Sequence, residues 1–510
     1  MFLGASGLGF DWPDEKGHFK VFVPDQNRQQ AVFDRLRQGI LSGTLPAGTR
    51  LPPTRVMAEE IGVARQTVVL AYERLAAEGY VRARTGSGTY VAPDLPDAAP
   101  TPASVPRVAA SDLSARGARL AAIPAHATNL ATNLAINGGT SGAAGLEAPV
   151  GSLLAGGVPA HDMFPAQAWL RCTARVLRGM APDLAGYPPP QGLPELRQQI
   201  AAHLAATRGL LADPDCIVVT GGTQQALRLA ADLLLDAGDA VWVEDPGYIA
   251  GRGALLAAGA VPVAVPSDGE GLDVAAGVRL APEARLALVA PSHSTPLGGA
   301  LPIGRRLALL DWAARANAWV LEDDCDSEFR WEGRPLPPLA TLDRTGRVIY
   351  CGTFSKTLAP AIRLGFAVVP APLVPAFVRA RTLMDRGSSA LSQAVLSEFM
   401  RQGLLAPHIR RMRTEYAGRR QAVLAALRRH APAVTPIAAP GGLHMVLRLP
   451  DGCDEAAAVR ACRARDLSVA PLRAYFAGPP RMAGLVIGFA GTPAALAADL
   501  CRRLAASVRT

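Results

Sequence analysis

Short apolar runs that alternate with longer helical stretches dominate the chain from about Val150 onward. Strands buried on both faces of a parallel sheet read as nearly continuous apolar runs, and the helices that connect them cover the two faces. The alternation therefore predicts an α/β domain built on a mostly parallel sheet. The predicted strands are Ile217–Thr220, Ala240–Glu244, Val261–Val265, Leu286–Ala290, Trp319–Asp323 and Val348–Gly352, and the clearest helices are Gln224–Leu235 and Arg305–Ala316.

A different pattern precedes this domain, at residues 23–92. The segment Gln29–Ile40 carries apolar residues at helical spacing, and a short helix is expected from Thr54, as its N-cap, to Gly62. A third helix is predicted at Arg65–Glu78, with a hairpin after it. This is the element order of a winged helix-turn-helix. On the third helix the residues expected to face the core are Val68, Tyr72, Leu75 and Ala76, and the hairpin strands are Tyr80–Arg84 and Thr89–Val91.

Composition divides the chain into four parts. Residues 1–22 are predicted to be a tail, 23–92 a winged helix-turn-helix, 93–149 a linker and 150–510 the α/β domain. The linker is rich in Ala, Pro, Ser, Thr and Gly, which bury little apolar surface, although a helix fits around Ser111–Ala122. The chain is therefore expected to be multidomain.

Charge and cysteine usage narrow the classes of partner. The net charge of +9 permits an acidic partner without establishing one. Residues 28–92 hold nine arginines and five acidic residues, which fits either a DNA-binding surface or a small helical bundle with solvated charges. No signal-peptide pattern is present, and no apolar stretch approaches the roughly 20 residues that cross a bilayer. Seven scattered cysteines without a CxxC pair indicate free thiols. We therefore expect a cytoplasmic protein with neither membrane nor metal.

One lysine stands out in the α/β domain. Of the 52 lysines and arginines only Lys16, Lys20 and Lys356 are lysines, and the first two lie in the predicted tail. Guanidinium stays protonated in proteins, whereas an amine can lose its proton and attack a carbonyl carbon. Lys356 is therefore a candidate Schiff-base lysine, although taken alone it could be a chance survivor of an arginine-biased composition.

The surroundings of Lys356 fit pyridoxal phosphate (PLP) chemistry. A carboxylate such as Asp323, at a strand end, can pair with the pyridine nitrogen. The turn Thr220–Gln224 joins a strand to a helix, where backbone N–H groups can hold a phosphate, and Ser355 and Arg363 could add to it. The consecutive acids around Asp323 could instead bind a metal, but neighbouring residues of a strand point to opposite faces, which weakens this alternative.

The segment from Ser42 to Val91 resembles the DNA-binding domain of GntR-type regulators, through the succession LPPTR, GVARQTV, AYERLAAEGYV and GSGTYV. The resemblance implies double-stranded operator DNA as a partner. Ala64 stands where the family more often has a small hydroxyl residue, so one phosphate contact is expected to be missing. The DNA-contacting positions of the family correspond here to Arg55, Arg65, Gln66 and Thr67, and on the wing to Gly86 and Gly88.

Residues 150–510 resemble fold-type-I aminotransferases, and the whole chain resembles the MocR subfamily of GntR regulators, in which a winged helix is fused to such a domain. The motifs that carry this resemblance are FPAQAW (164–169), YPPPQGLPELR (187–197), GGTQQAL (221–227), VWVEDPGY (241–248), PSHSTPLG (291–298), EDDCDSEFRW (322–331) and GTFSKTLAPAIRLGF (352–366). The resemblance implies PLP as the cofactor and a homodimer with shared sites.

The same resemblance assigns roles to individual residues. Lys356 is the Schiff-base lysine and Asp323 the partner of the pyridine nitrogen. Tyr187 reaches the phosphate of the neighbouring subunit. The other implied cofactor contacts are Gly222, Thr223, Ser355 and Arg363 at the phosphate, Tyr248 stacked on the ring and Thr295 near the ring hydroxyl.

Three positions depart from the related proteins. Cys325 stands where the subfamily usually has a tyrosine, and Ser294 replaces a usual glutamine. Val486 occupies the position of an arginine that grips the substrate carboxylate in aminotransferases, and Arg473 or Arg252 could substitute for it. The resemblance therefore implies a PLP-dependent transcriptional regulator that senses an amine, an amino acid or the vitamer, and not an efficient enzyme. The alternatives are an active aminotransferase with an accessory DNA-binding module, and a structural dimerisation domain with an empty cofactor site.

Overall fold

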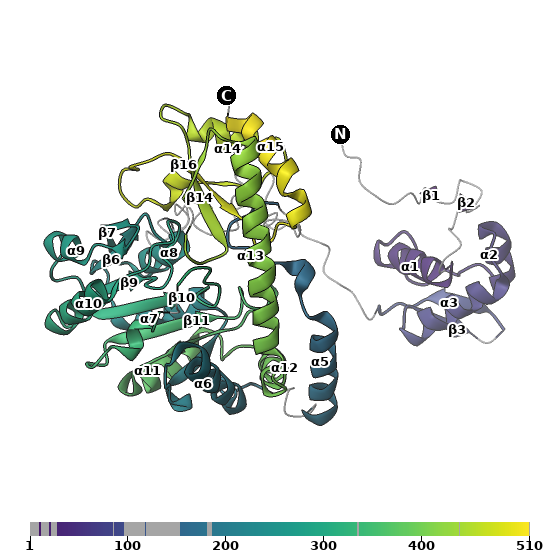
Figure 1. Cartoon of the computed structure of the whole chain (residues 1–510). Coiled ribbons are helices and arrows are strands. Elements are labelled where there is room, and N and C mark those ends of the chain that lie inside the picture. Colours follow the sequence, from purple (N-terminus) through teal and green to yellow (C-terminus); the bar gives the residue numbers. More distant parts are fainter. Residues whose placement is uncertain are drawn as a thin grey trace. The chain divides into compact units, whose positions relative to one another are not determined.

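The computed structural model describes residues 10–11, 20–21, 28–84, 86–95, 118, 153–180, 186–333, 336–437 and 439–508. The predicted tail at 1–22 and linker at 93–149, with the helix expected around Ser111–Ala122, lie almost wholly outside the described residues. The chain separates into two units, Met1–Asp112 and Leu113–Thr510 (Figure 1). The domain boundaries drawn from composition stay a prediction.

The first unit contains the predicted helices and hairpin in the predicted order. Its described elements are the short paired strands β1 (Phe10–Asp11) and β2 (Lys20–Val21), the helices α1 (Arg28–Leu41), α2 (Thr54–Ile61) and α3 (Arg65–Ala77), and the hairpin β3 (Val81–Arg84) and β4 (Gly88–Val91). The three helices enclose one apolar core with the hairpin strands. Gly62 ends α2 in the left-handed conformation with a φ of 67°, which glycine adopts without strain.

Two details of this unit differ from the prediction. Thr54 is the first helical residue of α2 and not its N-cap, a place taken by Pro53, and in the described structure no side chain caps this end. The fixed φ of proline already suits the entry to a helix. On α3, Ala76 is exposed and Ala71 is buried with Val68 and Leu75. The buried stripe therefore follows i, i+3 and i+7, and Ala76 lies beyond its edge.

The second unit is built on a sheet of eight strands within the described ranges, in the order β5-β12-β11-β10-β9-β6-β7-β8. All six predicted strands are present, and the sequence analysis missed β12 and β8. The sheet is mixed, because β12 runs antiparallel between β5 and β11, and β8 antiparallel to β7. The strands are β5 (Ile217–Thr220), β6 (Ala240–Asp245), β7 (Val261–Asp268), β8 (Gly271–Leu272), β9 (Leu286–Val289), β10 (Trp319–Asp324), β11 (Val348–Thr353) and β12 (Gly365–Val368).

Helices cover both faces of this sheet, as its apolar strands require. One apolar cluster joins α7, α8 and α11 to one face, and two clusters join α5, α6, α9, α10 and α12 to the other. Their bounds are α5 (Ala166–Met180), α6 (Pro194–Arg208), α7 (Thr223–Leu234), α8 (Ile249–Ala258), α9 (Val274–Leu280), α10 (Ile303–Arg315), α11 (Val374–Met384) and α12 (Ala390–Arg401).

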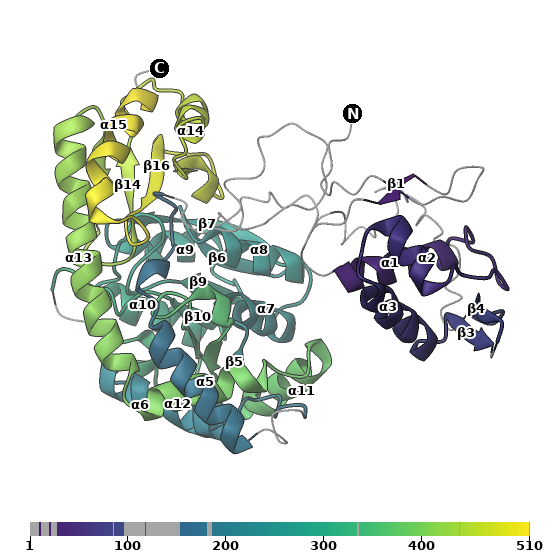
Figure 2. The ribbon, with the colours of Figure 1, turned by 90° about the vertical axis from the view of Figure 1, so that its right-hand side faces the viewer.

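A second, four-stranded antiparallel sheet follows, which the sequence analysis did not predict. The long helix α13 runs from the region of the large sheet to this smaller one, as both views show (Figures 1 and 2). In the described ranges, no helix is both long and apolar enough to cross a membrane. The elements are α13 (Leu405–His430), β13 (Thr435–Ile437), β14 (His444–Arg448), α14 (Glu455–Arg463), β15 (Ala470–Pro471), β16 (Gly484–Gly488) and α15 (Ala497–Val508).

Candidate functional site

The residues predicted to bind PLP gather where strands of the large sheet end. Asp323 is at the end of β10, and the loop after the neighbouring strand β11 carries Lys356. Tyr248 and Thr295 follow β6 and β9, and Gly222 follows β5. Ligands of open α/β sheets bind at the carboxyl ends of the strands. The topology therefore brings together candidates that lie far apart in the sequence.

The turn between β5 and α7 forms a cradle that suits a phosphate. Gly222 is the N-cap of α7 with a φ of 121°, so the helix begins on glycine backbone. A Cβ on Gly365 would lie 2.7 Å from the Cα of Gly222, so the turn leaves no room for a larger residue there. The Arg363 guanidinium is 3.9 Å from where a Cβ on Gly222 would lie. These features place a cation beside the N-terminus of a helix.

Hydroxyl groups of the cradle are available to a ligand. The Oγ1 atom of Thr223 is buried and has no hydrogen-bond partner among the described residues. Ser355 receives a hydrogen bond of 3.0 Å on its Oγ from the Thr353 hydroxyl, which leaves the Ser355 hydroxyl free to donate. A buried polar atom without a partner is costly and calls for one. The phosphate of PLP matches this set of donors.

Asp323, near the end of β10, is the second candidate contact for the cofactor. Its side chain is buried, and its Oδ1 atom finds no partner in the part of the chain that is described. Burial raises the pKa of Asp323 to about 7, the Asp324 and Asp326 carboxylates add to the rise, and Lys356 opposes it. A protonated pyridine nitrogen would supply the hydrogen bond that this carboxyl lacks. Tyr248 lines a small pocket together with Asp323.

Lys356 lies close enough to Asp323 for its charge to lower the pKa of that carboxyl. Its Nζ donates to the backbone oxygen of Gly157, so the lysine is held by a neutral acceptor. Cys325 follows the end of β10, and burial raises the pKa of its thiol well above the ordinary value. The Cys325 side chain is therefore a neutral thiol at physiological pH. Thr295 is half-buried and precedes Pro296.

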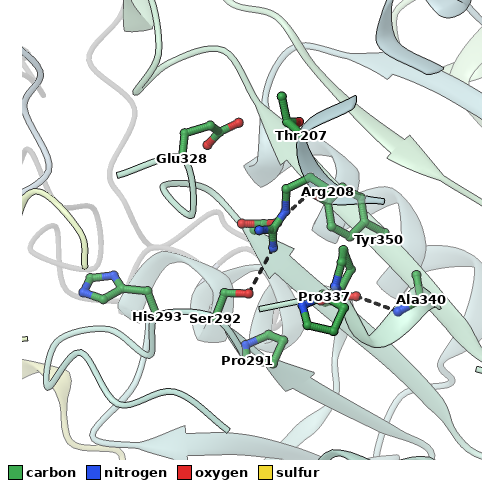
Figure 3. A network of polar contacts seen from close by, with 12 residues as sticks. Thr207, Arg208, Pro291, Ser292, His293, Glu328, Pro337, Ala340 and Tyr350 are labelled. Atoms are coloured by element: carbon green, nitrogen blue, oxygen red, sulfur yellow. Dashed lines mark hydrogen bonds and ion pairs between the residues drawn. The ribbon is translucent and has the colours of Figure 1, made fainter. Parts of the chain in front are cut away.

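The carboxylate next to Asp323 faces the other side of the sheet, as predicted. Arg208, the last residue of α6, contacts Asp324 at 2.8 Å, and the Tyr350 hydroxyl donates to the same carboxylate at 2.6 Å. Arg208 also donates to Ser292 at 3.1 Å, and Figure 3 shows it directed toward that hydroxyl beside the Tyr350 ring. Burial by itself lowers the pKa of Arg208, but Asp324 and Tyr350 raise it above the ordinary value.

This arrangement argues against the metal alternative. Glu322 accepts hydrogen bonds from the backbone N–H groups of Leu339 and Ala340, one on each carboxylate oxygen. Glu322 and Asp324 are thus already engaged by protein groups, on the face of the strand away from Asp323. Among the described residues no group of three potential ligands could hold a metal ion.

His293 sits beside the candidate site in a buried cluster. Its Nδ1 contacts Asp326 at 3.1 Å, and its ring lies edge-on to His444 of β14 at 5.2 Å. Burial lowers the pKa of His444 to about 4, so this histidine is neutral and its Nε2 donates to the Pro296 oxygen at 3.0 Å. The cluster therefore ties the small sheet to the loop after β9. Sequence reasoning missed Asp326 and His444.

The residues considered for a carboxylate anchor have other environments. Val486 is buried within β16. Arg252 donates to the backbone oxygens of Ala474 and Tyr475 at 3.1 and 3.2 Å, and Arg473 is exposed. Tyr187 is 79% exposed, with the Arg386 guanidinium 4.9 Å from the centre of its ring. Its exposure leaves it accessible to another molecule.

The predicted DNA-contacting residues lie at the surface of the first unit. Arg65 and Gln66 begin α3 and are exposed, Thr67 is half-buried, and Arg55 of α2 is exposed. On the wing, Gly88 has a φ of 118°, and a Cβ there would lie 3.0 Å from the Arg50 Nε. Gly86, with a φ of 73°, also adopts a conformation that favours glycine. Glycine therefore allows the tight turn between β3 and β4.

The comparison with known proteins agrees with these two units. Residues 28–91 match the model of bacterial regulatory proteins of the gntR family, and residues 153–504 match that of aminotransferases of class I and II. The chain is 40% identical to the probable rhizopine catabolism regulatory protein MocR of Rhizobium meliloti, over 92% of this chain and 91% of that protein.

Two further relatives represent a regulator and an enzyme. The chain is 32% identical to the HTH-type pyridoxine biosynthesis transcriptional regulator PdxR of Corynebacterium glutamicum, over 92% of this chain and 93% of that one. The solved structure of LysN, the α-aminoadipate aminotransferase of Thermus thermophilus complexed with N-(5'-phosphopyridoxyl)-L-leucine, is 29% identical, with a TM-score of 0.65. That similarity covers 70% of this chain and 92% of LysN.

Proposed function

We propose, from the premise that this chain belongs to the MocR-type regulators of the GntR family, that it is a transcriptional regulator whose aminotransferase-like unit binds PLP at Lys356. The effector that it senses is an amine, an amino acid or the vitamer itself. The observation that carries the proposal is the pair of buried atoms without a partner among the described residues, Oγ1 of Thr223 and Oδ1 of Asp323, at the strand ends of the sheet whose next loop carries the lysine. These atoms match the phosphate and the pyridine nitrogen of PLP.

Each residue of the site has a distinct task in this proposal. Bound PLP supplies an aldehyde carbon open to attack by an amine and a ring that withdraws electrons. The Lys356 amine is the nucleophile, and Asp323 holds the proton at the pyridine nitrogen. Tyr248 packs on the ring and Thr295 lies toward its hydroxyl. The residues proposed to hold the phosphate are Gly222, Thr223, Ser355 and Arg363, with Tyr187 contributed by the partner of a homodimer.

The proposed site favours sensing over efficient transamination. An incoming amine needs only the reactive carbon and an open pocket, whereas a full cycle needs a fixed substrate carboxylate and repeated proton transfer at Lys356. Val486 offers no charge for that carboxylate. Arg252 uses two of its donors on backbone oxygens, and Arg473 is exposed. The carboxylate of the effector therefore has no fixed cation to orient it, and we expect the effector to remain bound without turnover.

The link to DNA follows from the dimer. An effector can shift the equilibrium between two arrangements of the winged helices only if it binds them with different affinities. Those arrangements differ in how well two recognition helices match paired half-sites of the operator. By thermodynamic reciprocity, operator DNA changes effector affinity by the same factor.

Loss of Arg65 is expected to weaken operator binding. Arg65 is exposed at the start of α3, where a side chain can reach a base edge or a phosphate. Replacing it with alanine should cost about 1–3 kcal/mol if it reads a guanine, and binding by the unaltered protein should fall steeply with added salt. Electrophoretic mobility or anisotropy titrations on a selected operator measure both effects. The matched control is Arg428→Ala, an exposed arginine of α13, and equal affinities for both variants would refute the role of Arg65.

A screen of amino donors separates the regulator from the active aminotransferase. Each donor is tested with a keto acid acceptor for turnover and with operator DNA for altered affinity. We expect at least one donor to change DNA affinity while turnover stays well below about 1 per second, the low end for ordinary enzymes. Turnover at or above that rate, with no donor affecting DNA binding, would favour the enzyme.

A further inference from the structure

The phosphate cradle is hydrogen-bonded to a series of polar side chains that have no task in the proposed function. Gln225, on the first turn of α7, accepts a hydrogen bond of 2.6 Å from the Gly221 N–H on its Oε1. Its Nε2 donates to the Asp385 carboxylate at 2.7 Å. Gly221 immediately precedes Gly222 in the cradle. The side chain of Gln225 therefore joins the backbone of the phosphate turn to a residue 160 positions later.

Asp385 is held in turn by a buried arginine. Arg381, on the last turn of α11, is 0% exposed and contacts both oxygens of the Asp385 carboxylate. Its Nη2 donates to the Ser388 hydroxyl at 2.7 Å, and its Nε donates to the Val219 oxygen of β5 at 3.4 Å. A buried guanidinium needs a carboxylate to neutralise it. Burial by itself raises the pKa of Asp385, but the contacts with Arg381, Gly387 and Gln225 lower it, so the aspartate is ionised.

The loop that follows α11 links Asp385 to exposed residues. The Gly387 N–H donates to Asp385 at 3.0 Å, and Arg386 adopts a left-handed backbone with a φ of 62°. Such a conformation is costly for a residue other than glycine and persists only where its surroundings fix it. The Arg386 side chain packs on the ring of the exposed Tyr187. The buried Arg381 thus anchors, through the exposed Asp385, the loop whose Arg386 packs on the exposed Tyr187.

We propose that Gln225, Asp385 and Arg381 form a positioning relay, which sets the phosphate-binding turn and couples its occupancy to the loop 385–389 beneath Tyr187. The inference rests on the proposed function in one respect, namely that the ligand of the turn is the phosphate of PLP. A phosphate that accepts hydrogen bonds from the N–H groups of the turn restricts the position of the turn. Because Gln225 is hydrogen-bonded to both Gly221 and Asp385, this restriction also limits the movement of Asp385 and of its loop. In this proposal the three side chains position the groups that hold the ligand.

Three ligands separate positioning from a general structural role. The probes are PLP, pyridoxal, which lacks the phosphate, and inorganic phosphate, and the dissociation constant of each is measured by equilibrium titration. Gln225→Met removes both hydrogen bonds at nearly constant volume. It should raise the dissociation constants of PLP and inorganic phosphate about 10-fold, as expected for a loss of roughly one well-placed hydrogen bond. The dissociation constant of pyridoxal should change by less than about 2-fold.

A matched control and a double variant complete the design. Gln402→Met alters an exposed glutamine that follows α12, whose side chain donates instead to the Glu398 carboxylate, and it should change none of the three constants. Asp385→Asn should resemble Gln225→Met, and the double variant should be no worse than either single one, because the residues act as one unit. Equal losses for PLP and pyridoxal, or additive losses, would overturn the relay. If Gln225→Met fails to fold, Gln225→Glu retains the acceptor for Gly221 but faces Asp385 with a like charge, and it must show the same selective loss.

Hydrogen exchange tests the coupling to the surface without any use of PLP. Inorganic phosphate should slow amide exchange at 385–389 in the unaltered protein and in Gln402→Met, but not in Gln225→Met. Unchanged exchange in the unaltered protein at saturating phosphate would overturn the coupling. If the unaltered protein bound neither PLP nor phosphate, the proposed function would fail. If it bound both and Gln225→Met bound them equally well, only the relay would fail.

Discussion

Replacing Lys356 with alanine is expected to remove all covalent attachment of PLP and to leave the protein folded. The expectation rests on the nucleophile, because no other lysine lies in the second unit. Arginine cannot substitute, since its guanidinium stays protonated. Lys356→Arg should therefore lose the adduct as completely as Lys356→Ala does, although it keeps the positive charge. The side chain is half-buried and donates to a backbone oxygen, so its loss breaks no direct ion pair among the described residues.

Mass spectrometry after borohydride reduction measures this result. The unaltered protein incubated with PLP should gain one phosphopyridoxyl group, which peptide mapping places on Lys356. The chain offers a complete control, because Lys16 and Lys20 are its only other lysines. The double variant Lys16→Arg and Lys20→Arg should keep the adduct in full. A reduced adduct on Lys356→Ala would show that the lysine has been misassigned.

Replacing Arg208 with methionine should destabilise the second unit by about 3–5 kcal/mol. The side chains of Arg208 and Asp324 are 3% and 2% exposed, and methionine leaves the Asp324 carboxylate buried without its cation. The Tyr350 hydroxyl bonds to the same carboxylate but cannot neutralise it. Because Asp324 adjoins Asp323 on β10, the variant should also bind PLP more weakly. The network drawn in Figure 3 thus supports both stability and the site.

Chemical denaturation followed by circular dichroism gives the free energy of unfolding for this test. Arg315→Met is the matched control, because Arg315 pairs with Asp311 at 2.8 Å but both side chains are more than half exposed. Exposed pairs contribute about 0–1 kcal/mol. Arg208→Met combined with Asp324→Leu should recover much of the loss, since two apolar residues leave no charge behind. A loss below about 1 kcal/mol for Arg208→Met alone, no more than an exposed pair contributes, would contradict the buried pair.

Local patterns were sufficient for most of the fold. The six predicted strands all occur, since each is a continuous apolar run whose burial needs no knowledge of its neighbours. The weaker signals failed. β12 was not predicted because its four residues directly follow the Arg363 turn, and β13 to β16 are short and punctuated by proline and glycine. On α3, helical spacing alone could not decide between Ala71 and Ala76, because which alanine is covered depends on the position of α1.

The sequence by itself determined which residues are the candidates for the proposed chemistry of this protein. Three local features were sufficient: a single lysine in an arginine-rich domain, an acid at a strand end and a glycine turn before a helix. Each can be recognised without knowledge of the tertiary contacts. Only the tertiary structure decided how those residues are held. Arg208 meets Asp324, and Gln225 meets Asp385, across 116 and 160 positions of chain. No periodicity encodes such pairs, because the free energy of a buried charge depends on which partner the topology of the sheet brings to it.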